Sequence, residues 1–349
     1  MPGRSTGAKA LVSAVAFLAL LALLAALVDW RQVFDQLRRA DRSDLALGTL
    51  LLLLGYAAFA WRWQRLMRPP PPFGPVFHVS NLGNMANTLL PLRPGDALRA
   101  FLMRGVGQQT LASAASSLVV ERWYEQIMRL AALGGAVVFG AGLAVSPWSL
   151  GGMAAFLLGS WALMVWMTRR RETVLAVWPA RLARLPRLDE PGARAALAGL
   201  IDGFAGIASP ARMLAALLYS FLCWALFWGY HYLCLRAIAA GLPGGVPPRQ
   251  ALALSLASLA LAPPSAATLP GLYQVSIGLP LALLGFDRSL LAAYTLLMNM
   301  ILMIVVNGLG AWGALRVGVS LESIFSRSAR TSQARLERLE QPGEGEPED

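Results

Sequence analysis

Charged residues are scarce in this sequence. Only 14% of its 349 residues are Asp, Glu, Lys or Arg, whereas about a quarter of the residues in a typical soluble domain are charged. Hydrophobic residues make up 56% of the chain, and the mean hydropathy is +0.55. This composition excludes an ordinary soluble domain and indicates a chain that folds in lipid.

Histidine and cysteine are rarer still. His78 and His231 are the only histidines, which leaves little material for a histidine-based metal site or a Ser-His-Asp triad. The two cysteines, Cys223 and Cys234, fall in one predicted helix. At that spacing they lie about 16 Å apart, too far for a disulfide. We therefore expect two buried thiols, and neither a metal nor a cofactor.

Lysine is nearly absent, because Lys9 is the only one and the net charge of +11 comes almost entirely from arginine. The arginines lie beside hydrophobic runs and not in one block with aromatic residues, so nucleic acid is not an expected partner. Cytoplasmic flanks of membrane spans and lipid headgroups are the partners that such arginines favour.

Long uncharged runs are what the sequence has in abundance. They cover residues 10–28, 45–61, 130–168, 213–235, 251–286 and 289–315. Since one membrane-spanning helix needs about 20 apolar residues, these runs predict an all-α, polytopic helical bundle with about six full spans. We expect residues 1–318 to form one membrane domain and residues 319–349 a flexible cytoplasmic tail.

Arginine-rich flanks predict the topology. By the positive-inside rule, the N-terminus, residues 62–77, the basic loop at 168–212 and the tail lie in the cytoplasm of a cell (inner) membrane. No small-residue cleavage site follows residues 10–28, so we interpret them as a retained first span. The six predicted spans are residues 10–28, 45–61, 113–139, 148–167, 213–235 and 289–315.

Two segments remain, residues 81–104 and 251–286. Each lies between two stretches that we place in the cytoplasm, and two full spans already connect those stretches. Each must then enter and leave the membrane on one side, as a re-entrant hairpin. Hairpins from opposite faces are typical of an inverted repeat with a site near the membrane midplane.

The basic loop contains apolar residues at helical spacing, which predicts an interfacial amphipathic helix with Arg194 and Asp202 facing outward. The residues of its apolar face are Ala193, Leu197, Leu200, Ile201, Phe204 and Ile207. A simple linker helix is an equally good interpretation.

The first predicted hairpin combines helix breakers with charge. Its breakers are Pro91, Pro94 and Gly95, and its charged residues are Arg93, Asp96, Arg99 and Arg104. A broken, charged helix at membrane depth is tolerated only where protein or a wet cavity surrounds it. The alternative is a basic cytoplasmic loop. Asp96 follows Pro-Gly and suits a helix N-cap that orients Arg99 three residues later.

A second charged cluster follows at the start of the next span. Glu121, Glu125 and Arg129 are successive i,i+4 neighbours on a helix, and Arg122 lies about 100° from Glu121. We expect this polar stripe to face the first hairpin and to pair with its arginines. The two clusters together hold five arginines and three carboxylates, so an anionic group such as a phosphate would balance the site. A structural ion-pair network is the alternative.

These residues carry a resemblance to a known family. The pattern Asn87-x-x-x-Pro91-x-Arg93-x-Gly95-Asp96-x-x-Arg99-Ala100, followed by Glu121-Arg122-x-x-Glu125, resembles the flippase-like membrane domain of lysylphosphatidylglycerol synthases. The second Pro/Gly hairpin of that family is matched by Pro264-Ser265-Ala266, Gly271 and Tyr273, with Pro270 beside them. Ala267 and Thr268 stand where the family has Pro-Gly, and Glu125 stands where it usually has Asp.

The resemblance implies a lipid flippase that binds an anionic headgroup and moves it between leaflets. The family's soluble aminoacyltransferase domain has no counterpart here, so we do not expect an enzyme. Membrane lipids are the expected partners, together with a separate lipid-modifying enzyme. The residues expected to bind substrate are Arg93, Asp96, Arg99, Arg104, Glu121, Arg122 and Glu125, and those expected to shape the hairpins are Asn87, Pro91, Pro94, Gly95, Pro264, Ser265, Pro270, Gly271 and Tyr273.

Two other functions stay open on the sequence alone. One is an intramembrane acyl- or phosphotransferase that uses Asp96, Glu121 or Glu125 as a base. The other is a non-transporting scaffold that recruits a lipid-modifying enzyme through the basic loop and the tail.

Overall fold

The fold is all-α in the part that the structure describes. This computed structural model describes residues 30–67, 69–90, 94–107, 109–141, 146–183, 189–204, 207, 209–240, 245–262, 272–283 and 286–319. Within these ranges it contains twelve helices and no strand, which confirms the predicted fold class. The helices are α2 (Trp30–Arg39), α3 (Arg42–Leu66), α4 (Phe73–Leu89), α5 (Gly95–Val106), α6 (Leu111–Val138), α7 (Pro147–Arg169), α8 (Arg171–Leu182), α9 (Glu190–Phe204), α10 (Pro210–Ala239), α11 (Pro248–Leu261), α12 (Leu272–Leu283) and α13 (Arg288–Val317).

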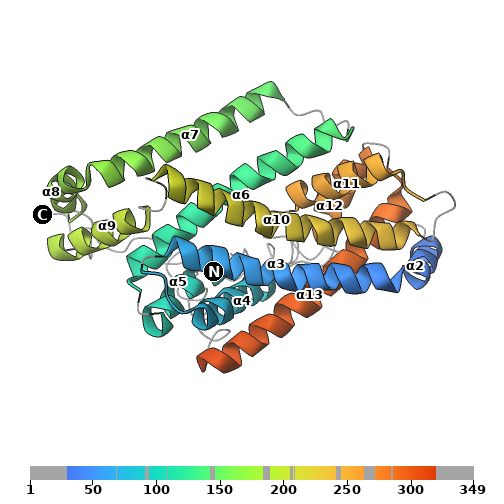
Figure 1. Ribbon diagram of the computed structural model, residues 1–349, viewed down its shortest axis with the longest axis horizontal. Helices are drawn as coiled ribbons and strands as arrows, with labels where there is room; N and C mark the ends of the chain where they lie inside the picture. The colour runs from blue at the N-terminus through green and yellow to red at the C-terminus, as the bar shows by residue number, and fades with distance from the viewer. Residues whose placement is uncertain are drawn as a thin grey trace, which may run out of the picture.

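The longest helices run along the long axis of the molecule, with α8 and α9 at one end and α2 at the other (Figure 1). Four of them, α3, α7, α10 and α13, are long and apolar enough to cross a membrane. They contain four of the six predicted spans. The predicted span 113–139 corresponds to α6, whose 28 residues measure about 42 Å at 1.5 Å per residue but carry four charges. The predicted first span, residues 10–28, lies outside the described residues.

Both predicted hairpins contain a pair of helices. In the first, α4 and α5 pack against each other across the break. This pair begins at Phe73 and not at residue 81, because α4 starts directly after the prolines that end at Pro72. In the second, α11 and α12 flank the predicted break. Pro264, Ser265, Pro270 and Gly271 lie outside the described residues, and Tyr273 belongs to α12.

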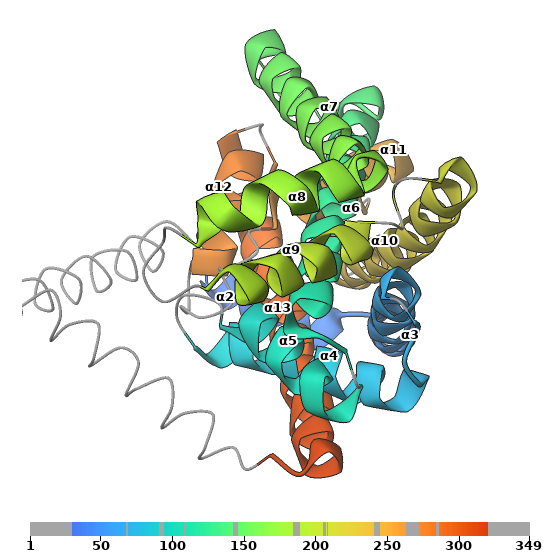
Figure 2. The ribbon, with the colours of Figure 1, turned by 90° about the vertical axis from the view of Figure 1, so that its left-hand side faces the viewer.

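The basic loop folds as α8 and α9, which lie side by side across the end of the molecule that faces the viewer in Figure 2. On α9, Ala193, Ile201 and Phe204 are buried, whereas Arg194 and Asp202 are exposed. This confirms the predicted amphipathic pattern, and the apolar face packs against α6.

Glycines allow the central helices to approach closely. A Cβ atom added at Gly313 of α13 would lie 2.5 Å from the backbone oxygen of His78 on α4, and one added at Gly310 would lie 2.3 Å from the Cβ of Met85. Lipid chains are as apolar as the side chains, so van der Waals contact at such small-residue interfaces stabilises helix pairs in membranes.

This packing predicts opposite outcomes for one substitution at two positions of α13. Gly313→Ala should lower the thermal unfolding temperature in detergent, because overpacking against an unyielding backbone costs about 1–3 kcal/mol. Gly308→Ala is the matched control, since a Cβ atom there meets nothing within 4 Å. It should leave the unfolding temperature unchanged or slightly raised, because alanine favours the helix by up to about 1 kcal/mol. Equal unfolding temperatures for the two variants would contradict the observed α4–α13 contact.

Candidate functional site

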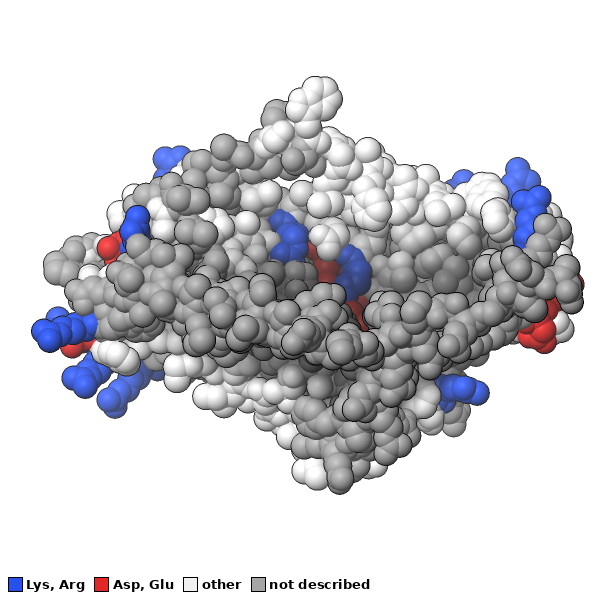
Figure 3. Space-filling view, turned by 180° about the vertical axis from the view of Figure 1, so that it is seen from behind, with Lys and Arg blue, Asp and Glu red and all other residues white. Residues whose placement is uncertain are grey.

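Charged residues meet where α3, α5 and α6 pack together. Five of the predicted ones, Asp96, Arg99, Glu121, Arg122 and Glu125, form one ion-pair network with Arg62. Figure 3 shows charged side chains in a hollow in the middle of one face, while most other charges visible in that view lie toward the two ends of the molecule.

The inner part of the network is fully buried. Arg99 on α5 donates from Nη1 and Nη2 to Oε1 and Oε2 of Glu121 on α6, at 2.9 and 3.0 Å, and both side chains are 0% exposed. The guanidinium of Arg99 also lies 4.1 Å from the ring centroid of Trp63. Bidentate geometry and an aromatic face are the two environments that suit a buried arginine best. This pair therefore holds α5 to α6.

The outer part of the network reaches the surface. Arg122 donates from Nη2 to both carboxylate oxygens of Asp96, at 2.7 and 2.6 Å, and from Nη1 to Oε2 of Glu125 at 2.6 Å. The side chains of Arg122 and Asp96 are each 31% exposed, and that of Glu125 is 14% exposed. Arg122 is thus the arginine of this network that an outside ligand reaches.

Sequence reasoning missed Arg62 as a member of the network. It follows the apolar run at 45–61, so it was assigned to a cytoplasmic loop with residues 63–77. In the structure α3 continues to Leu66, and Arg62 is buried with its Nη2 atom 3.0 Å from Oε1 of Glu125. Its guanidinium lies 5.0 Å from the ring centroid of Phe59, one turn earlier. Phe59, three residues before Arg62, is the feature of the sequence that could have indicated a helix continuing past residue 61.

The described network is charge-balanced, with three arginines against three carboxylates. The other arginines that made the predicted positive excess are not part of this network. Arg104 is exposed on α5 and forms no ion pair with the described residues. Arg93 lies outside the described residues, together with Pro91. The remaining predicted arginine, Arg129, bonds elsewhere.

Arg129 connects the charged stripe of α6 to the second hairpin. Its Nη1 atom donates to the carbonyl oxygens of Ala260 and Ala262 at the C-terminal end of α11. The last carbonyls of a helix have no partner within the helix, and the negative end of the helix dipole attracts a cation. Arg129 therefore caps α11 just before the Pro-rich break.

Asn87 and Gly95 shape the turn of the first hairpin. The Asn87 side chain accepts a hydrogen bond from the Gly95 backbone N–H at 2.7 Å. A Cβ atom on Gly95 would lie 1.9 Å from the backbone oxygen of Gly83, so only glycine fits there. The prediction that Asp96 is the N-cap was wrong, because α5 starts at Gly95 with Pro94 as its N-cap. Asn87 satisfies the free N–H instead, which leaves Asp96 to pair with Arg122.

The two histidines lie apart from this network, whereas Cys223 lies near Arg62, Glu121 and Glu125. His231 is buried beside Ser258 at 2.7 Å, and Ser258 lies 2.6 Å from the hydroxyl of Tyr294. Cys223 and Cys234 are free and buried, as their spacing predicted. Within the described ranges, no group of three or more His, Cys, Asp or Glu could hold a metal ion.

Comparison with known proteins gives one match. A family model described as the lysylphosphatidylglycerol synthase TM region matches residues 9–310. No curated protein and no solved structure matches the chain.

The buried pair predicts a characteristic stability pattern. Arg99→Ala removes both hydrogen bonds from the buried Glu121 carboxylate and leaves it only Arg62, at 3.8 Å. Breaking a buried ion pair costs about 3–5 kcal/mol. Thermal unfolding in detergent should therefore occur at a much lower temperature than in the wild type. The double variant Arg99→Ala with Glu121→Gln should recover most of this loss, because no stranded charge remains. A double variant as unstable as the single one would show that the ion pair is not what holds α5 to α6.

Proposed function

Since the chain belongs to the lysylphosphatidylglycerol synthase TM region family, we propose that this multi-pass membrane protein is a lipid flippase. It binds an anionic lipid headgroup at the open edge of the ion-pair network and moves that headgroup between leaflets. The family and the long apolar helices establish the membrane location and a lipid-related function. Headgroup binding and movement between leaflets are the proposed steps.

One observation carries the proposal: a charged network within a helical bundle that is closed on one side and open on the other. Ionisable groups at membrane depth are expensive, so they are paired and mark substrate pathways. Arg122 holds Asp96 through two short bonds at the exposed edge. A lipid phosphate offers the same pair of oxygens to a guanidinium and can replace Asp96 there.

The network divides the predicted binding residues by role. Arg99 and Glu121 are sealed from solvent, so we assign them to holding the hairpin. Arg122, Asp96 and Glu125 are partly exposed, so we assign them to the headgroup. For Arg93, the sequence pattern is the basis on which we propose a second headgroup contact.

In the orientation that we propose, the α4–α5 hairpin enters from the cytoplasm and the α11–α12 hairpin from the opposite face, with both chain termini cytoplasmic. The membrane is the cell (inner) membrane. Substrate then lies between two opposed broken helices, as in inverted-repeat transporters. The Arg129 cap ties α11 to α6, the helix against which α5 of the first hairpin also packs.

The geometry favours transport over catalysis. Asp96, Glu121 and Glu125 are each ion-paired with arginine, and a carboxylate held in this way is a weak general base. A scaffold without transport activity has no need of a partly open ion network inside the bundle, although the basic α8–α9 end suits recruitment of a lipid-modifying enzyme.

The proposed orientation is checked by cysteine labelling in intact cells. Arg171→Cys on α8 and Arg249→Cys on α11 lie at opposite ends of the long axis (Figure 1). A membrane-impermeant maleimide should label Arg249→Cys from outside and should reach Arg171→Cys only after permeabilisation. The native cysteines are buried and give little background. Labelling of both positions from one side would rule out the opposed hairpins.

The headgroup contact is tested in liposomes that contain fluorescent phosphatidylglycerol. Arg122→Gln should slow movement between leaflets about tenfold or more, because charge-assisted hydrogen bonds are worth about 1.5–3 kcal/mol. Arg104→Gln is the matched control on α5, since Arg104 is exposed and outside the network.

Without Arg122, Asp96 keeps Arg99 at 3.6 Å and Glu125 keeps Arg62 at 3.0 Å, so Arg122→Gln should unfold near the wild-type temperature. Equal transport rates in the two variants would exclude Arg122 as the headgroup contact. Wild-type protein that moves no lipid would exclude the flippase function itself.

A further inference from the structure

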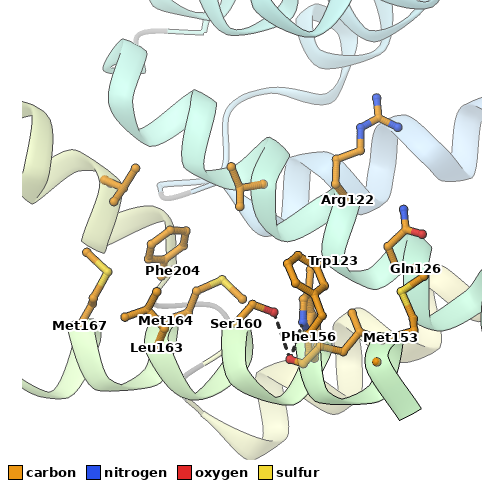
Figure 4. Close-up of a pocket in the computed structure, with 14 residues that line it drawn as sticks. Arg122, Trp123, Gln126, Met153, Phe156, Ser160, Leu163, Met164, Met167 and Phe204 are labelled. Atoms are coloured by element: carbon orange, nitrogen blue, oxygen red, sulfur yellow. Dashed lines mark hydrogen bonds between the residues drawn. The ribbon is translucent and has the colours of Figure 1, made fainter. Parts of the chain in front are cut away.

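A groove beside the ion network has the chemistry of a hydrocarbon-binding site. It lies between α6, α7 and α9, and its volume is about 910 Å³, within the 300–1,000 Å³ common for small-molecule sites. Phe156, Leu163 and Met164 of α7 form one wall, and Phe204 of α9 lies opposite. Figure 4 shows Arg122 and Gln126 toward one end of the groove, and Met164, Met167 and Phe204 toward the other.

Among the described residues that line this groove, Arg122 is the only charged one. The other polar groups are mostly satisfied within the protein: the Trp123 indole N–H and the Ser160 hydroxyl both donate to the carbonyl oxygen of Leu157, each at 3.1 Å. The groove therefore offers an outside ligand long apolar walls, with Arg122 at one end, where its guanidinium is bound to Asp96 and Glu125.

The groove is open to the surrounding lipid, because α7 packs mainly on α9 and α8 and leaves much of its own surface uncovered. Phe156 is 65% exposed and Leu163 is 55% exposed. In a bilayer such a surface meets hydrocarbon chains.

We propose that this groove holds one acyl chain of an anionic phospholipid while the phosphate of the same molecule contacts Arg122. This inference rests on the proposed function and adds the chain site and the substrate class: a lipid recognised by both its anionic headgroup and its hydrocarbon chain. A phosphate that replaces the partly exposed Asp96 on Arg122 selects this occupant. A transmembrane helix with its side chains is about 10–12 Å wide and brings no anion to Arg122, so it fits the groove less well.

Two glycines of α7 provide a matched test. Gly152 lines the groove, whereas Gly151 does not and lies about 100° farther round the helix, away from the lining residues of α7. Both are exposed, and a Cβ atom added at either meets nothing within 4 Å. Both positions therefore have room for a larger side chain, but only Gly152→Trp directs its indole toward the groove.

The probe is phosphatidylglycerol with a photoreactive diazirine in one acyl chain, added to the full-length protein in nanodiscs. In the wild type and in Gly151→Trp, crosslinked peptides should map to α6, α7 and α9. Gly152→Trp should lower this crosslinking about tenfold, equivalent to ~1.4 kcal/mol. Diacylglycerol with the same chain should also crosslink less, because it has no phosphate for Arg122.

Three results would overturn the inference: equal crosslinking in the two tryptophan variants, crosslinks that map to other helices, or equal crosslinking of diacylglycerol. Its failure is separable from failure of the flippase function. Crosslinking that Gly152→Trp removes, in a protein that moves no lipid, keeps the chain site and refutes transport. Transport that depends on Arg122, with crosslinking unchanged in Gly152→Trp, keeps the flippase function and refutes the chain site.

Discussion

The pairing of Arg99 with Glu121 is the interaction on which the arrangement around the site depends. A charge at membrane depth has no water to solvate it, so each one must find an opposite charge or a backbone dipole. Arg99 meets this requirement with two bonds to one carboxylate and an aromatic face beneath it. The same requirement brings Arg62 inward from the end of α3 and directs Arg129 to the free carbonyls of α11. Three helices and the end of a fourth are thereby placed by electrostatic pairing, while glycine contacts place α4 against α13.

The ion pairs of the network differ in their exposure to solvent, and this difference determines which of them can exchange partners. The Arg99–Glu121 pair is sealed, so it cannot exchange partners at low cost. The Arg122–Asp96 pair is partly exposed, so water or an anion can take the place of either member. A transporter needs both properties, because its substrate must bind and leave while the scaffold around it stays folded. Arg122 also lines the apolar groove along α7, so the ion-pair network and this groove meet at one residue.

Much of this protein was determined by the sequence itself. The apolar runs predicted an all-α membrane bundle, because about 20 apolar residues are needed for one span and few soluble structures tolerate such runs. Helical spacing predicted the amphipathic α9, and Pro91, Pro94 and Gly95 predicted the break between α4 and α5. The i,i+4 spacing of Glu121, Glu125 and Arg129 predicted a charged stripe on α6. These are local properties, since they depend on residues within a few turns of one another.

Only the tertiary structure decided which charges meet. Glu121 could have paired with any of several arginines, and helical periodicity does not say which helix packs against α6. The structure selects Arg99, adds Arg62 from a stretch predicted to be a loop, and leaves Arg104 outside. It also shows that Asn87, and not Asp96, caps α5. The Asn87 side chain lies eight residues away in sequence and accepts the hydrogen bond of the Gly95 N–H. The groove between α6, α7 and α9 likewise has no signature in the sequence, because its walls come from three helices. Pairing partners and cavities are products of long-range packing, whereas spans, breaks and stripes are set by neighbouring residues.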